Sequence, residues 1–206
     1  MITVALFKGF ILGAGMIMPL GVQNSYVLSQ GIKRNFHFTA ASICILCDIT
    51  LIALGVFGGS QLLAQQPQLI TVAGWGGIIF LLSYAAIAIR NVIQNSYQQS
   101  DQVKALNTRK QIIVTTLAVT LLNPHVYLDT VMILGGVGSM YEGHSKYAFA
   151  FGTMLASLTW FMLLATTAAK MAPVLGTPKA QRIIDGIIAL IMMAVAFSIF
   201  NMLLAR

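Results

Sequence analysis

The chain has 206 residues, of which 58% are hydrophobic and 8% are charged, and its formal net charge is +7. So few polar side chains cannot cover a soluble globule of this size, and lipid is therefore the expected solvent. The basic residues lie mostly between apolar stretches, where they would face anionic lipid head groups. This placement argues against a nucleic-acid partner.

Six apolar runs have the length of about 20 residues that a helix needs to cross the hydrocarbon core of a bilayer. Each run contains at most one or two ionisable residues, which is typical of transmembrane helices. The sequence therefore predicts an all-α membrane protein with about six transmembrane helices. The six runs are Val4–Leu28, Phe38–Phe57, Leu69–Ile89, Ile112–Leu134, Tyr147–Met171 and Ile183–Leu204.

A polar stretch, residues 91–110, separates two halves of three runs each. We expect one transporter domain, 1–206, with half repeats at about 1–90 and 111–206. Because each half crosses an odd number of times, the second half should lie inverted relative to the first, as a 3+3 inverted repeat. Nine Lys and Arg residues lie at one set of helix ends and three at the other, which predicts a cytoplasmic linker and both termini outside.

Proline interrupts the first and fourth runs at corresponding positions, because Asn24 lies five residues after Pro19 and Asp129 lies five residues after Pro124. Proline removes a backbone donor and frees carbonyl groups from the helix. Unwound backbone inside a membrane is tolerated where it lines a cavity, so the two breaks predict one substrate site near the middle of the membrane. The residues expected at the breaks are Pro19, Gly21, Gln23, Asn24, Asn123, Pro124 and His125.

Two carboxylates, those of Asp48 and Asp129, lie well inside apolar runs. Such a group costs about 2.5–3.5 kcal/mol on insertion scales, which favours a cationic partner or a functional role. The alternatives are that each is protonated, or is paired with a helix-end cation such as Arg182 or Lys170. Two carboxylates at one cavity suit a cationic solute, a coupling proton, or both. His125 is a candidate proton relay, and a neutral imidazole bonded to a backbone carbonyl is the alternative.

No cofactor, metal or enzyme activity is expected. Cys44 and Cys47 lie three residues apart in one run beside Asp48, but further metal ligands are missing nearby, so we interpret them as packing residues without a disulfide. The sequence has no nucleotide-binding P-loop and no nucleophile and base at recognisable spacing. Two glycine groups are expected at close helix contacts: Gly74, Gly76 and Gly77, and Gly135, Gly136 and Gly138.

The two helix breaks carry extended motifs, Pro19–Asn24 with Gln30–Arg34, and Leu122–Asp129 with Gly135–Gly138. These motifs resemble those of the lysine-exporter (LysE-type) family. The likeness continues through Trp75–Gly77, Ala156–Phe161 and Ala180–Ile184, and so it covers nearly the whole chain. Within the family, the chain is most similar to the arginine-exporter branch. One departure is Val22, which stands where the usual motif has a second proline, and this predicts a softer first break.

The resemblance implies a secondary transporter that exports basic L-amino acids, arginine and lysine, from the cytoplasm through a multi-pass protein of the bacterial inner membrane. The substrate's cationic group would pair with Asp48 and Asp129. The expected partners are the basic amino acid and membrane lipids, and whether protons are exchanged in antiport is left open. The alternatives are an exporter of neutral amino acids or another small solute, and then a cation or metal exporter.

Overall fold

The computed structural model describes residues 1–19, 21–59, 67–93 and 108–204, and these residues form helices joined by short connections, without a strand. The predicted all-α class is confirmed. Leu20 and most of the predicted linker lie outside the described residues. The helices are α1 (Ile2–Ile17), α2 (Val22–Ile32), α3 (His37–Leu54), η1 (Gly55–Gly59), α5 (Pro67–Ile93), α6 (Arg109–Leu121), α7 (Pro124–Tyr127), η2 (Leu128–Leu134), α8 (Gly135–Ser139), α9 (Gly143–Leu175) and α10 (Pro178–Leu204).

Four spans are continuous and long and apolar enough to cross a membrane: His37–Gly58, Gly74–Ile93, and the whole of α9 and of α10. Two further spans are bent helix pairs. The pair α1 and α2 bends by 78°, and α6 bends by 63° relative to the segment Pro124–Ser139. If each bent pair is one crossing, the described residues contain six spans, in agreement with the predicted runs. The first bend is the larger one.

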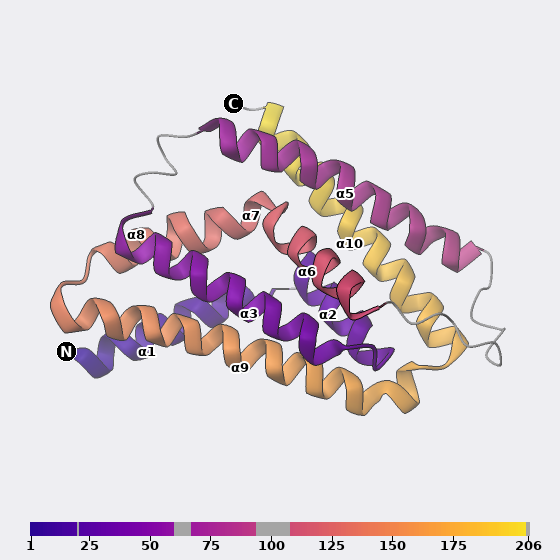
Figure 1. Ribbon diagram of the computed structural model, residues 1–206, viewed down its shortest axis with the longest axis horizontal. Helices are drawn as coiled ribbons and strands as arrows, with labels where there is room; N and C mark the ends of the chain where they lie inside the picture. The colour runs from indigo at the N-terminus through magenta and orange to yellow at the C-terminus, as the bar shows by residue number, and fades with distance from the viewer. Residues whose placement is uncertain (20, 60–66, 94–107, 205–206) are drawn as a thin grey trace.

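The helices pack in pairs that join the two halves of the chain. In Figure 1, α5 and α10 run side by side along one edge of the molecule, while α1, α3 and α9 lie together along the other. Large apolar side chains on the outer surface of the first pair are exposed, among them Ile79, Leu190 and Phe197. An apolar surface of this kind suits contact with lipid tails.

Glycines allow the closest helix contacts, as the sequence predicted for some of them. A Cβ atom on Gly135 would lie 2.6 Å from the carbonyl carbon of Gly55, so α8 and η1 touch through their backbones. A Cβ atom on Gly77 of α5 would likewise collide with the backbone carbonyl oxygen of Leu122. Gly136, by contrast, has nothing within 4 Å of its Cβ position, so this one member of the predicted group makes no such contact.

The short helix α2 lies in the middle of the bundle. It contacts α3, α6, α9 and α10, and nine of its eleven residues are buried. Polar residues such as Ser25, Ser29 and Gln30 are among them. Because α2 follows the first break directly, its first residues lie at the break.

Candidate functional site

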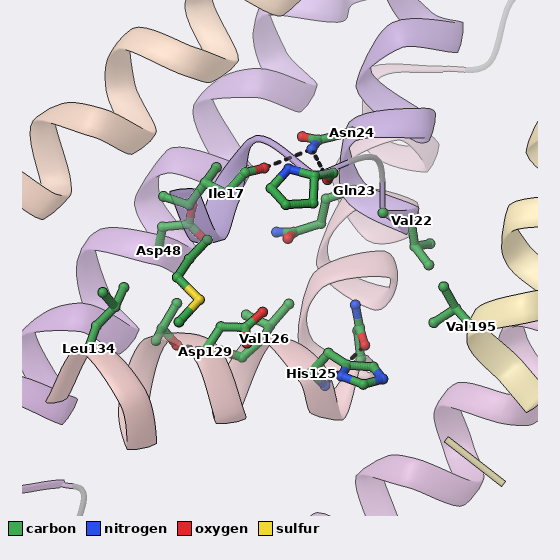
Figure 2. Close-up of a pocket in the computed structure, with 15 residues that line it drawn as sticks. Ile17, Val22, Gln23, Asn24, Asp48, His125, Val126, Asp129, Leu134 and Val195 are labelled. Carbon is green, nitrogen blue, oxygen red and sulfur yellow. Dashed lines mark hydrogen bonds between the residues drawn. The ribbon is translucent and has the colours of Figure 1, made fainter. Parts of the chain in front are cut away.

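A cavity of about 210 Å³ lies between the two helix breaks, and Figure 2 shows its lining. The wall comes from the end of α1, the start of α2, the middle of α3, the α7–η2 segment and α10. Of the nine residues predicted for the site, eight line this cavity: Pro19, Gly21, Gln23, Asn24, Asp48, Asn123, His125 and Asp129. The ninth, Pro124, is buried as the first residue of α7, behind the wall and toward Gly77 of α5.

Asn24 holds the first helix break together. Its side-chain nitrogen donates to the carbonyl oxygens of Ile17 at 2.8 Å and Pro19 at 2.7 Å, which the break frees from the helix. Its side-chain oxygen accepts a hydrogen bond from Trp160 Nε1 at 3.0 Å. Both ends of the amide are therefore engaged with the protein, and Asn24 acts on the cavity mainly by fixing the shape of the break.

The carboxylate of Asp48 is held by a neutral donor. Ser157 of α9 donates its hydroxyl hydrogen to Oδ2 of Asp48 at 2.6 Å, and both side chains are buried. The Gln23 amide also interacts with this carboxylate and donates to Thr120 Oγ1 at 3.1 Å. Residues from α2, α3, α6 and α9 thus form one hydrogen-bonded group around Asp48.

The second break is held in a similar way. Asn123 is the N-cap of α7, and its side-chain oxygen accepts from the backbone N–H of His125 at 3.1 Å. The His125 ring places Nε2 3.4 Å from the Ser198 hydroxyl of α10, so its contact is a side chain and not the backbone carbonyl considered above. His125 and Asp129 lie four residues apart on one helical segment and interact electrostatically.

Neither cavity carboxylate is neutralised by a Lys or Arg side chain in the described part of the chain, and His125 is the basic side chain beside Asp129. Within the described ranges, Asp48 and Asp129 form no ion pair, and so the pairing with Arg182 or Lys170 considered above is absent there. Asp129 sits in η2, a π-helical segment of seven residues that interrupts the α-helix at the cavity wall. Interruptions of this kind occur frequently at functional sites. The cavity therefore presents two acidic groups to any solute that enters it.

The two cysteines do not line the cavity. Both are free thiols, and Cys44 Sγ lies 3.9 Å from the Thr120 hydroxyl in the packed core. Over the part of the chain that the structure describes, no three His, Cys, Asp or Glu side chains gather as a metal site.

Sequence reasoning missed three kinds of residue. Ser157 and Thr120 are isolated hydroxyls in apolar runs, and Trp160 is a single indole, so only the tertiary packing shows that they support Asp48, Gln23 and Asn24. Asp185 was also missed, and it is buried near the start of α10.

Comparison with known proteins decides the family. The model of the LysE type translocator family matches residues 14–202, which include both breaks and the whole cavity wall. The chain belongs to the LysE type translocator family. This membership confirms the predicted family and makes the chain a multi-pass membrane translocator and not an enzyme.

The family has curated members that are similar along nearly their whole length. Proteins named arginine exporter protein ArgO from Salmonella enteritidis, Salmonella newport and Salmonella typhimurium are each 46% identical to this LysE-type chain over 193 residues. The alignments cover 94% of this chain and 92% of each relative. No solved structure matches it.

Proposed function

We propose that this translocator exports basic L-amino acids, with arginine preferred, from the cytoplasm across the bacterial inner membrane. The observation that carries the proposal is the presence of Asp48 and Asp129 in one cavity, without a Lys or Arg side chain paired to either in the described part of the chain. A guanidinium or ammonium group would supply the missing positive charge and would form charge-assisted hydrogen bonds. The names of the similar Salmonella proteins support the same substrate class.

The first break supplies a second contact for an amino acid. Gly21 is the N-cap of α2 and offers no side-chain cap, and the first residues of α2 line the cavity. The N-terminus of a helix attracts anions through its free N–H groups and its dipole. The substrate's carboxylate would bind at the start of α2, while its cationic side chain would reach Asp48 and Asp129.

Alternating access would arise from motion of one half of the chain against the other. The bent pair α1–α2 packs on α9, and the bent segment from α6 to α8 packs on α3 and η1. Since α9 and α3 are the second spans of their halves, the two packing arrangements correspond. This correspondence supports the predicted inverted repeat, in which both breaks belong to one site that can open to either side.

The test is amino-acid release from cells that lack their own exporter. The cells would be loaded with dipeptides that contain arginine, lysine or alanine, and the free amino acid that appears outside would be measured with and without this protein. We expect faster release of arginine and lysine and no change for alanine. Equal stimulation of alanine release would favour the neutral-solute alternative, and no stimulation of any release would refute the proposal. Repeating the assay after collapse of the pH gradient tests proton antiport.

A further inference from the structure

His125 and Asp129 form a pair of titratable side chains on one wall of the cavity. They lie four residues apart on the segment that runs from α7 into η2, and Figure 2 shows both at the cavity. Residues at this spacing lie on one face of a helix. The two side chains interact electrostatically, and no hydrogen bond to the Asp129 carboxylate is present among the described residues. The imidazole is therefore the neighbour that can change the charge around Asp129.

The Asp48 carboxylate has neighbours of a different kind. It is held by the hydroxyl of Ser157 and the amide of Gln23. Neither a serine hydroxyl nor a glutamine amide changes its charge in the physiological pH range, whereas an imidazole does. The two cavity carboxylates thus differ in one respect, which is that Asp129 has beside it a base that can take up a proton near neutral pH.

The helices around His125 bring few other charges to it. Helix α7 packs on α5, α6 and η2, and Ser198 of α10 lies 3.4 Å from Nε2 of His125. Near α7 these neighbours have stretches without any titratable side chain, namely residues 67–83 of α5, 111–121 of α6 and 186–204 of α10. On α7 itself, the Tyr127 hydroxyl donates to a backbone carbonyl, and Asp48 is the further acidic group of the cavity. A proton on His125 would therefore act mainly on the two cavity carboxylates, and first on Asp129.

Ser198 can hold the imidazole in either protonation state. A serine hydroxyl is both a donor and an acceptor, so it can donate to an unprotonated ring nitrogen and accept from a protonated one. The contact between Ser198 and Nε2 of His125 can thus persist while the ring gains or loses a proton. The ring would stay beside Asp129 in both states, and only its charge would change.

We propose that His125 is the site of an exchanged proton, and that this proton and the cationic group of the substrate use Asp129 in alternation. The inference rests on the proposed export of basic amino acids. A protonated His125 neutralises Asp129 and repels a second cation, whereas a neutral His125 leaves the carboxylate available to a guanidinium. Binding of arginine would release the ring proton to water in the cavity. After arginine leaves on the outer side, a proton from that side would bind to the ring again.

This exchange balances in charge. Arginine carries one net positive charge near neutral pH, and one proton would return for each arginine that leaves. The cavity would therefore cross between its two states with the same charge in both directions, and a pH gradient that is acidic outside would drive export. The competing explanation is a permanently neutral imidazole that only orients Asp129.

Proton release on arginine binding separates the two explanations. Binding to the purified full chain in detergent would be measured by calorimetry from about pH 5.5 to 8.5, in buffers of different ionisation enthalpy. Below the titration range of His125, the wild type should release about one proton per arginine, and its Kd should rise about tenfold per pH unit. His125→Gln should bind arginine without this release, with a Kd that changes less than about twofold. Proton release that persists in His125→Gln would assign the proton to a carboxylate and overturn the proposal.

Two other histidines supply the controls. His144→Gln makes the same change at an exposed position near the start of α9 and should behave as the wild type. The double variant His37→Gln with His144→Gln keeps His125 as the last of three histidines, so NMR can follow its protonation directly. Arginine should deprotonate it at a pH where the free protein holds it protonated, and this decides the question if His125→Gln does not reach the membrane.

The possible failures are distinguishable. Arginine that binds to the wild type without releasing a proton, or without changing the NMR signal of His125, would overturn this inference and leave the proposed function intact. A wild-type protein that binds no arginine at any pH would refute the proposed function, and the proton site with it.

Discussion

The hydroxyl of Ser157 in α9 lies 2.6 Å from Oδ2 of Asp48 in α3, where both side chains are buried. A hydroxyl orients a carboxylate without cancelling its charge, whereas a lysine or arginine would do both. In surroundings of low polarity this uncancelled charge interacts strongly with any cation that enters. The arrangement thus keeps Asp48 fixed in position and still able to attract a basic solute.

Replacing either cavity carboxylate with its amide should impair arginine export. Asp48→Asn and Asp129→Asn keep the shape of the side chain but remove the charge, and a hydrogen bond to a charged group is worth about 1.5–3 kcal/mol against about 1 for a neutral one. Each variant should therefore lose about tenfold or more in export rate at matched membrane level. Wild-type export from both would end the proposal, and loss in only one would assign binding to that half of the chain.

The Asn24 amide should matter more for stability than the indole that binds it. Asn24→Asp keeps an acceptor for Trp160 but places a carboxylate oxygen against the carbonyls of Ile17, Met18 and Pro19, and three hydrogen bonds are lost. Trp160→Tyr loses the single indole hydrogen bond. Thermal unfolding in detergent should show the larger drop for Asn24→Asp, by about 1–3 kcal/mol or more for the unsatisfied groups. The reverse order would contradict the assigned role of Asn24.

Two adjacent glycines in α8 should respond in opposite directions. A Cβ on Gly135 would collide with the backbone of Gly55, and overpacking of this kind costs about 1–3 kcal/mol. Gly136 has open space at the same position, so alanine there should raise helix stability by up to about 1 kcal/mol. Gly135→Ala should thus unfold at a lower temperature than wild type and Gly136→Ala at the same or a higher one. Equal losses in the two variants would argue against the close contact of α8 with η1.

The cysteines should be dispensable. Replacing Cys44 and Cys47 together with Ser keeps the volume close to that of the thiols and removes any soft metal ligand. Export of arginine should remain near the wild-type rate, and added zinc should affect the variant and the wild type equally. Loss of export at normal membrane level would show that at least one thiol has a function.

The orientation of the chain is open to a direct test. Nine basic residues against three predict a cytoplasmic linker at residues 91–110 and termini outside. A reporter domain fused after residue 100 should be active only if it works on the inner face of the membrane. A reporter fused at either terminus should be active only if it works on the outer face. A linker that is accessible from outside would reverse the predicted orientation.

The membrane spans and the two helix breaks could be predicted from the sequence because both depend on local chemistry. A run of about 20 apolar residues has few alternatives to a membrane helix, and Pro19 and Pro124 interrupt their helices wherever those helices pack. The matched spacing of Asn24 and Asp129 was enough to place both breaks at one cavity, which the structure contains. The sequence alone therefore predicted most of the cavity wall.

Residues whose role depends on packing could not be found in this way. Asp185 follows the basic residues Lys179 and Arg182 in the first turns of α10, where a carboxylate is ordinarily expected to be exposed, and the packing of α2 against α10 buries it. Asn24 was expected to face the substrate, yet its amide nitrogen is used by carbonyls that the break itself releases. Partners of this kind appear only when segments distant in sequence meet.

The π-helical segment η2 suggests how the cavity wall could change during evolution. A helix that gains one residue absorbs it as a wider turn of this kind, while the residues on either side keep their register. The insertion or deletion of a single codon between Leu128 and Leu134 would rotate Asp129 relative to the cavity without moving Pro124 or the Gly135 contact. Members of one lineage could thus acquire a new solute preference in one genetic step, with the surrounding bundle intact.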